Sequence, residues 1–509
     1  MSLSNRLAAR GYRSEAAKDI SMDQTRQSTF EVLSYLGSDV RDRLVADNYY
    51  QPHRVLHTLP HAERTTTDNM APKNRIIIDT DPGVDDVLAI LLAFGAKAED
   101  LEVLLISLTF GNVDVRSCLR NVVAIFHILE KELKWRAEHG KAPGFEGITK
   151  YKPLVAIGAD EPLQDTIESA DYFHGIDGLA GTHTTHPHFS PEEDWKNLFQ
   201  EPPPDDDLTK KAKAEVTNIQ DLEPITNKMF TPSLVPAHKE ILRLLRENPP
   251  DTITLIAIGP LTNFALAAAE DPETFLRCKE VITMGGTVDG IGNVTPVSEF
   301  NVYADPYAAA RVYALTSPIP SSTMPIPMEG ERSVHMSTYP PHLSKQLKLT
   351  LMSLDITEFH MLSRGAFNAH ASSLAAQRSP LAEWMTAFMT PMLDKMERLH
   401  TGHEGDGAAL ALHDPLCVWY VLTQDDKRWQ ASARSPEDIR IETAGQWTRG
   451  MTVGDKRPRK RRNSDGEVPH DRGNWLGNRS GNRVYRMLES PGRDVAAKYL
   501  LDVIFGPKE

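Results

Sequence analysis

Short, continuous apolar segments that alternate with helical segments constrain the fold of this chain more than any other feature. Residues 75–79 (RIIID) form a β-branched apolar run, and residues 84–93 form a helical run after a Pro-Gly turn. Further strands are expected at residues 101–109, 154–157, 252–258 and 281–284, and further helices at 118–133, 237–246, 261–269 and 306–315. Buried strands separated by helices are typical of a parallel sheet that helices cover on both faces. The sequence therefore predicts an α/β protein with a mostly parallel, Rossmann-like central sheet.

Several segments interrupt this alternation. Residues 1–72 are polar and irregular, which predicts a partly disordered N-terminal extension with one helix near residues 29–36, followed by a single domain over residues 73–509. Within that domain, segments of low periodicity predict surface insertions at about residues 183–232, 318–347 and 455–473. The segments 454–455 and 483–485 are expected to form a C-terminal hairpin that the last insertion divides.

Charge and cysteine content exclude several classes of protein. The chain has 509 residues, and 56 Lys and Arg against 70 Asp and Glu give a net charge of −14, which argues against a broad nucleic-acid-binding surface. No apolar run reaches the ~20 residues of a membrane-spanning helix. The three cysteines, Cys118, Cys278 and Cys417, are too sparse and too widely spaced for a disulfide framework or a zinc site. We therefore expect a cytoplasmic protein with no nucleic-acid or membrane partner.

Two segments are compatible with a cellular location other than the cytoplasm. Residues 456–462 (KRPRKRR) carry six basic residues in seven, which is typical either of a solvated loop or of a nuclear-localisation patch. Arginines precede the first acidic residue, Glu15, which is a weak indication of a mitochondrial transit peptide.

The segment IIIDTDPGVDD at residues 76–86 carries the most chemical information. The strand delivers Asp79 and Asp81 at its carboxyl end, and Asp85 and Asp86 open the next helix. Ligands of α/β sheets bind beyond the carboxyl ends of the strands. Four carboxylates crowded there repel one another unless a cation lies among them, and oxygen ligands alone suit Ca²⁺ or Mg²⁺. The alternative, that Asp85 and Asp86 only favour a helix N-terminus, explains two acids and not four.

Further short motifs follow DTDPGVDD along the chain: HGIDGL (174–179), IGPLTN (258–263), MGG (284–286), EFN with DP (299–301, 305–306) and HDP (413–415). DTDPGVDD is similar to the N-terminal signature of the inosine-uridine preferring nucleoside hydrolase family, and the later motifs resemble segments of that family in the same order. The resemblance covers about residues 74–505. It implies the nucleoside hydrolase fold and an enzyme that hydrolyses the N-glycosidic bond of ribonucleosides to ribose and a free purine or pyrimidine base. It also implies a homo-oligomer, either a dimer or a tetramer.

The resemblance further implies a calcium site and a general base. Asp81, Asp86, Asp414 and the backbone carbonyl of Ile258 would hold Ca²⁺. Asp81 would also take a proton from the attacking water.

The remaining implied residues bind the nucleoside or protonate its base. His413 would protonate the leaving base, and His174 would lie at the same pocket. The preferred base stays open, because residues 402–412 are rich in Gly and Ala where family members often place an aromatic residue. The substrate-binding residues that the resemblance implies are Asp85, Asn112, Met284, Asn293, Glu299, Phe300, Asn301 and Asp414.

Two alternatives compete with this hypothesis. A strand that ends in Asp-x-Asp also suggests a haloacid-dehalogenase-type phosphatase, with Asp79 as nucleophile and Asp81 as acid/base on Mg²⁺. The second alternative is a non-catalytic riboside-binding or nuclear interaction protein derived from the hydrolase family.

Overall fold

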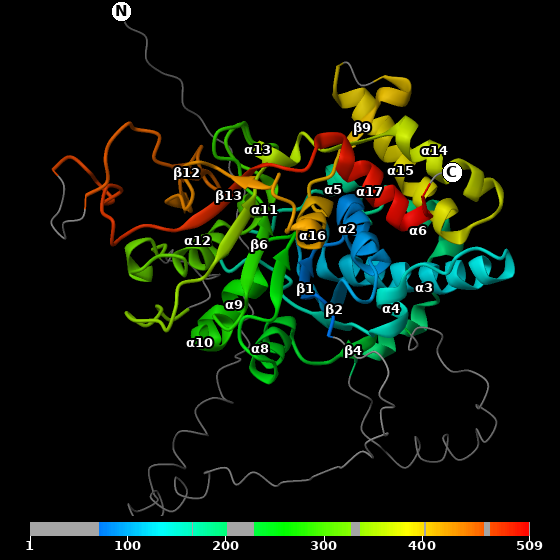
Figure 1. Cartoon of the computed structure of the whole chain (residues 1–509), viewed down its shortest axis with the longest axis horizontal. Coiled ribbons are helices and arrows are strands. Elements are labelled where there is room, and N and C mark those ends of the chain that lie inside the picture. The colour runs from blue at the N-terminus through cyan, green and yellow to red at the C-terminus, as the bar shows by residue number, and fades with distance from the viewer. Residues whose placement is uncertain are drawn as a thin grey trace, which may run out of the picture. The chain divides into compact units, whose positions relative to one another are not determined.

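The central sheet of the domain has the predicted architecture. The computed structural model describes residues 71–164, 166–200, 229–326, 336–401, 404–462 and 469–507. Strands from these residues form a nine-stranded sheet of order β10-β13-β7-β6-β5-β1-β2-β3-β4 (Figure 1). Every neighbouring pair in it is parallel except β10 and β13. The strands are β1 (Asn74–Thr80), β2 (Leu101–Leu108), β3 (Leu154–Ile157), β4 (Thr231–Ser233), β5 (Thr254–Ala257), β6 (Glu280–Met284), β7 (Leu349–Met352), β10 (Gln430–Ala431) and β13 (Val484–Glu489).

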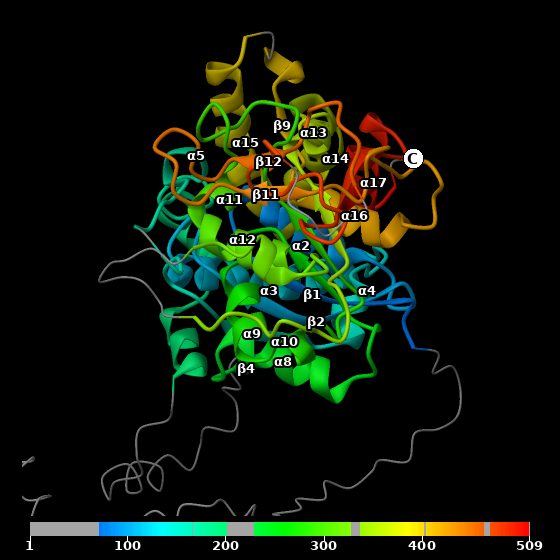
Figure 2. The same ribbon diagram turned by 90° about the vertical axis from the view of Figure 1, so that its left-hand side faces the viewer.

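Helices cover both faces of the sheet. One hydrophobic core contains residues of α2, α3, α15, α16 and α17, and the other contains residues of α8, α9, α10 and α12. Figure 2 shows α8, α9 and α10 grouped together, with α13 and α15 at the opposite end of the view. The helices are α2 (Val84–Gly95), α3 (Val115–Glu138), α4 (Glu146–Lys150), α5 (Asp171–His174), α6 (Thr182–Thr185), α8 (Ala237–Glu247), α9 (Thr262–Glu270), α10 (Pro272–Phe275), α11 (Phe300–Ala304), α12 (Pro306–Ala314), α13 (Leu354–Thr357), α14 (Arg364–Ala376), α15 (Pro380–Leu399), α16 (Pro415–Thr423) and α17 (Arg493–Phe505).

The centre of β1, Ile76–Ile78, is apolar without interruption because both faces of the strand are covered there. Ile76 and Ile78 belong to one core, and Ile77 belongs to the other. Successive side chains of a strand point to opposite faces, so a strand between two helical layers has no solvent-facing position. None of the helices in the described ranges is long and apolar enough to cross a membrane.

The predicted C-terminal hairpin is wrong. The short strand β12 (Thr452–Gly454) pairs with β11 (Ile439–Ile441), in a sheet of their own. Strand β13 instead extends the main sheet by pairing with β7, where its alternate residues Val484 and Arg486 are buried. This pairing buries one face of β13 against the main sheet, and it satisfies backbone groups of the edge of β7.

The segment around residues 183–232 is more than a surface insertion. Phe189 and Trp195 are buried in the first core, and Thr231–Ser233 forms the edge strand β4. These two aromatic side chains attach the segment to the core. Hydrophobic periodicity, on which the prediction rests, does not detect isolated buried residues. The expected helix near residues 29–36 lies outside the described residues, as do parts of all three predicted insertions.

Candidate active site

The aspartate-rich segment lies where the strand order of the sheet reverses. Strand β1 pairs with β2 on one side and with β5, which follows much later in the chain, on the other. Asp81 follows β1, and Pro82 and Gly83 turn the chain into α2. Ligands of open α/β sheets bind beyond the carboxyl ends of strands at such a reversal. The fold thus places the aspartates at the expected binding edge.

A second segment completes a group of carboxylates at this edge. One side-chain oxygen each from Asp85, Asp86 and Asp414 lies within 4.8 Å of the others, and all three residues are buried. Asp414 immediately precedes α16, which packs against α2. The two helices therefore bring Asp414 to the first turn of α2.

The carboxylate of Asp86 is held by four donors. Its Oδ1 accepts hydrogen bonds from the Thr80 hydroxyl (2.6 Å) and from the backbone N–H of Asp81 (3.3 Å). Its Oδ2 accepts from the backbone N–H of Gly83 (3.0 Å) and from Nδ2 of Asn112 (2.9 Å). This carboxylate therefore ties the turn after β1 to the loop after β2.

Asp81 lies beside this group, and one of its oxygens has no partner. Its Oδ2 accepts from the backbone N–H of Asn112 (2.7 Å), whereas Oδ1 is buried without a hydrogen bond to any described residue. A Cβ atom on Gly111 would lie 2.0 Å from Oδ2, and one on Gly259 would lie 2.5 Å from Oδ1. Glycine at both positions is what lets the carboxylate fit between the loops that follow β2 and β5.

The electrostatics of the group favour a bound cation. Burial, with repulsion from Asp86, raises the pKa of Asp81 well above its usual range, and burial, with repulsion from Asp85, does the same for Asp414. Burial also raises the pKa values of Asp85 and Asp86. No Lys or Arg among the described residues forms an ion pair with any of the four carboxylates. Oxygen donors without a counter-charge, including the unpartnered Oδ1 of Asp81, suit a hard divalent cation.

The predicted ligand Ile258 lies at the same edge, and its carbonyl already has one donor. The residue follows β5, and its backbone N–H donates to the carbonyl of Asp79 (2.9 Å). Nδ2 of Asn301 donates to the Ile258 carbonyl (3.0 Å) and lies 3.4 Å from Sδ of Met284. The structure thus brings Ile258, Met284 and Asn301 together. A carbonyl has two lone pairs, so one remains for a cation.

Glu299 is engaged by backbone groups. Its carboxylate accepts from the N–H groups of Gly286 (2.7 Å), Asn301 (2.8 Å) and Val302 (3.1 Å), and burial raises its pKa. These bonds cap α11 and fix the turn after β6.

Asn293 and Phe300 lie in and after the loop that leads to α11. Asn293 is exposed, and its Oδ1 accepts from the backbone N–H of Phe300 (3.0 Å). Phe300, which begins α11, is half-buried. This bond closes the loop between β6 and α11.

Two histidines lie near the carboxylates, and both are neutral. Nδ1 of His174, at the end of α5, accepts from the backbone N–H of Val84 (3.2 Å). Nδ1 of His413 pairs with the Thr357 hydroxyl (2.8 Å). Burial lowers the pKa of His174 to about 3 and that of His413 to about 4, and His413 contributes to the shift of His174.

A buried polar network behind the turn after β1 was missed by sequence reasoning. Nδ2 of Asn121, on α3, donates to the carbonyls of Pro82 (2.8 Å) and Asp177 (2.9 Å). Its Oδ1 lies 2.6 Å from Nε2 of His183, and Nδ1 of that ring lies 2.6 Å from the Ser190 hydroxyl. The available signal was a lone Asn within the buried apolar face of a helix.

Comparison with a family model identifies the chain over most of its length. Residues 76–472 match the model of the inosine-uridine preferring nucleoside hydrolases. A hydrolase of that description from Crithidia fasciculata is 28% identical over 384 residues, which cover 75% of this chain and 88% of the relative. Uridine nucleosidase 1 from Arabidopsis thaliana is 31% identical over 247 residues, which cover 48% of this chain and 55% of the relative.

Solved structures have the same fold. A plant nucleoside hydrolase aligns with a TM-score of 0.55 and 21% identity, covering 86% of this chain and 100% of that one. A purine-preferring ribonucleoside hydrolase from Gardnerella vaginalis aligns with a TM-score of 0.55 and 19% identity, covering 85% of this chain and 98% of that one. The parallel sheet and its flanking helices are therefore shared with these proteins.

Proposed function

The chain belongs to the inosine-uridine preferring nucleoside hydrolase family, and on that premise we propose that it hydrolyses ribonucleosides with Ca²⁺ and with Asp81 as general base. Membership makes it a hydrolase of the N-glycosyl bond of nucleosides. The observation that carries the proposal is the group of buried carboxylates without a counter-charge. Neither the family match nor the relatives support the non-catalytic alternative or the phosphatase alternative.

Asp81, Asp86, Asp414 and the Ile258 carbonyl would hold the cation, and Asp85 is close enough to share it. A hard cation at this position, when bound, compensates the carboxylates and lowers the pKa of a water molecule. Asp86 is held in place by its four hydrogen bonds, which take up the lone pairs of both oxygens, so cation binding would require one donor, such as the Asn112 side chain, to turn away.

Asp81 would remove the proton from the attacking water. Its Oδ1 has no hydrogen bond to give up, whereas Oδ2 stays anchored to the backbone of Asn112. The N-glycosyl bond breaks as positive charge develops on the ribose ring, and buried carboxylates stabilise that charge. Asp81 would thus transfer the proton, and the four aspartates together would stabilise the transition state.

Ribose binding would use residues at the ends of neighbouring strands. Asn112 follows β2, and Met284 and Asn301 meet at the Ile258 carbonyl. Asp85, Asn293, Glu299 and Phe300 would complete the set.

Glu299 also has a structural role that does not require bound ribose. Because it accepts three backbone N–H groups, it also holds the loop between β6 and α11 in place.

His413 would give a proton to the leaving base, and His174 would line the same pocket. A base anion leaves poorly without a proton, so general-acid catalysis lowers the barrier. The acid form of each ring is the imidazolium, and because burial lowers its pKa, a protonated ring here would readily give its proton to the leaving base.

Reducing-sugar release tests the proposal. Ribose is measured from inosine, adenosine, guanosine, uridine and cytidine, with and without EDTA, for the wild type and Asp81→Ala. We expect EDTA and Asp81→Ala each to abolish release, and readdition of Ca²⁺ to restore only the wild type. Asp160→Ala is the matched control, because Asp160 is exposed and has no described partner.

Two results would contradict the proposal. Release that persists in EDTA would exclude the cation, and release that persists in Asp81→Ala would exclude Asp81 as the base. The ranking of the five nucleosides determines the preferred base in either case.

We further propose that the protein is a cytoplasmic homo-oligomer. Light scattering of the purified chain gives its mass in solution, and a monomer would contradict the proposal. Fractionation of cells that express the tagged chain tests its location.

A further inference from the structure

A cavity outside the candidate active site is lined by cationic and aromatic side chains. Its volume is about 400 Å³, and its walls include Arg457, His470, Arg472 and Trp475 together with one carboxylate, Asp455, which is paired with Arg457. This size falls within the usual range for small-molecule sites, roughly 300–1,000 Å³. Strand β12 supplies another wall.

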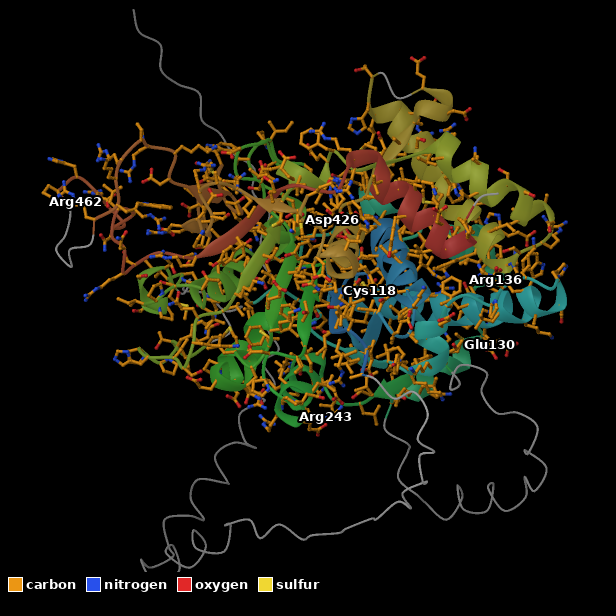
Figure 3. The ribbon with its side chains drawn as sticks, viewed as in Figure 1. Cys118, Glu130, Arg136, Arg243, Asp426 and Arg462 are labelled. Carbon is orange, nitrogen blue, oxygen red and sulfur yellow. The ribbon has the colours of Figure 1, made fainter. Side chains whose placement is uncertain are left out.

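The surroundings of the cavity are basic although the chain as a whole is acidic. Residues 455–483 contain nine Lys and Arg against four Asp and Glu, whereas the whole chain has a net charge of −14. Figure 3 shows blue nitrogen atoms of side chains gathered around Arg462 in this region. Such a local excess of positive charge attracts anions.

Part of this charge has no carboxylate partner. Arg472 is exposed and makes no hydrogen bond or ion pair with the described residues. The guanidinium of Arg483 donates only to backbone carbonyls, those of Asn478, Ser480, Gly481 and Asn482. Burial, with repulsion from Arg461, lowers the pKa of Arg483.

Arg457 is fixed in the wall of the cavity. Its Nε and Nη2 donate to Asp455 (2.8 and 2.7 Å), and Nη2 also donates to Asp471 (2.9 Å). Its Nη1 has no bond to a described residue, so it remains a donor on an already oriented guanidinium group. Arginine forks match the geometry of phosphate oxygens.

Trp475 supplies an aromatic wall that is already braced. The Arg440 guanidinium lies 3.8 Å from the centroid of its ring, and Arg440 is itself held by Asp438 (2.8 Å) and by the carbonyl of Gly473 (2.6 Å). Indole rings stack on bases of any kind. His470 adopts a positive φ of 63°, a backbone conformation that costs energy for a residue other than glycine and clusters at binding sites.

We propose that this cavity binds a nucleoside monophosphate, with the phosphate on Arg457 and Arg472 and the base against Trp475. The cavity is separate from the buried carboxylates, which would repel a phosphate. Binding at this cavity is independent of nucleoside hydrolysis at the candidate active site.

Equilibrium titration of the full chain with AMP tests the proposal. We expect one AMP per chain in the wild type, and binding weaker by about tenfold in Arg472→Gln and in Trp475→Leu, since each removes one strong contact. Arg246→Gln, an exposed arginine on α8 with one ion pair, is the control and should bind AMP as the wild type does. Melting curves check that the variants fold. Arg472→Gln is expected to melt as the wild type does, because Arg472 is exposed.

Adenosine and inorganic phosphate distinguish the outcomes. Adenosine binding that Arg472→Gln leaves unchanged belongs to the candidate active site. Phosphate that competes with AMP at equal concentration would overturn the contact with the base. Absent AMP binding, or AMP binding unchanged in Arg472→Gln, would overturn the site itself.

Discussion

The backbone N–H of Val84 donates a hydrogen bond to Nδ1 of His174 at 3.2 Å, across 90 residues of sequence. The bond joins the first turn of α2, which carries Asp85 and Asp86, to the end of α5. Because Nδ1 accepts, the proton of the neutral ring lies on Nε2. His174 thus both satisfies a buried backbone donor and presents a fixed N–H.

Substituting the two histidines should have different effects, because His174 holds a backbone N–H whereas His413 is proposed to protonate the leaving base. His413→Ala should lower the hydrolysis of inosine by about 10²–10⁴-fold and leave that of p-nitrophenyl riboside nearly unchanged, because nitrophenolate leaves without a proton. His174→Ala should impair both substrates and lower the melting temperature, because it orphans the Val84 N–H. Steady-state rates on the two substrates check this. Equal losses in His413→Ala would show that His413 does not protonate the base.

Neutralising single aspartates of the buried group should change metal-free stability in opposite directions and abolish calcium binding in both cases. Asp414 has no capping hydrogen bond to its own helix and a strongly raised pKa, so Asp414→Asn should raise the metal-free melting temperature. Asp86→Asn should lower the unfolding free energy, and with it the melting temperature, by about 1–3 kcal/mol, because the amide keeps one accepting oxygen and turns its NH₂ group toward two of the four donors. Both variants should lose the stabilisation that Ca²⁺ confers. Melting curves in EDTA and in Ca²⁺ check these changes, with Asp160→Asn as control. A lower metal-free melting temperature in Asp414→Asn would contradict the account.

Gly259→Ala should displace Asp81 without unfolding the protein. The new Cβ would lie 2.5 Å from Oδ1 of Asp81 and 3.1 Å from Cγ2 of Thr109, so the carboxylate has to move. A displacement of this size lowers kcat/KM by about a hundredfold. Gly407→Ala is the matched control, because its Cβ would meet no atom within 4 Å. Kinetics of both variants check the prediction, and wild-type activity in Gly259→Ala would show that the position of Asp81 tolerates change.

The His183 network predicts a pH dependence of stability. Burial lowers the pKa of His183 in the folded chain to about 4, whereas the unfolded chain has the ordinary value near 6.5. The stability from this ring is complete above the unfolded pKa and is lost as pH falls from 6.5 toward 4, because the unfolded state binds the proton more tightly. The unfolding free energy of the wild type should fall by about 2 kcal/mol between about pH 7.5 and about pH 5 from this group alone.

His183→Gln isolates this contribution. The amide N–H can still donate toward Oδ1 of Asn121 and does not titrate, so its profile should be flatter and should approach that of the wild type near pH 5. Denaturant unfolding at several pH values measures both profiles. Parallel profiles would show that His183 does not change its protonation on unfolding.

The sequence by itself determined the features that depend on neighbours along the chain. The apolar run of β1 and the helix after Gly83 follow from local periodicity, and the turn between them brings Asp81, Asp85 and Asp86 close in any fold that contains it. The alternation of strands and helices likewise predicted the class of sheet. These features are local, because a few bonds restrict where each side chain can lie.

Only the tertiary structure decided which distant groups meet. It placed Asp414 against the first turn of α2, Asn121 beneath Pro82, and Asn301 on the carbonyl of Ile258. It also paired β13 with β7 and not with β12. Such contacts depend on how whole helices and strand edges pack, and local periodicity carries no information about which of several compatible surfaces will be buried together.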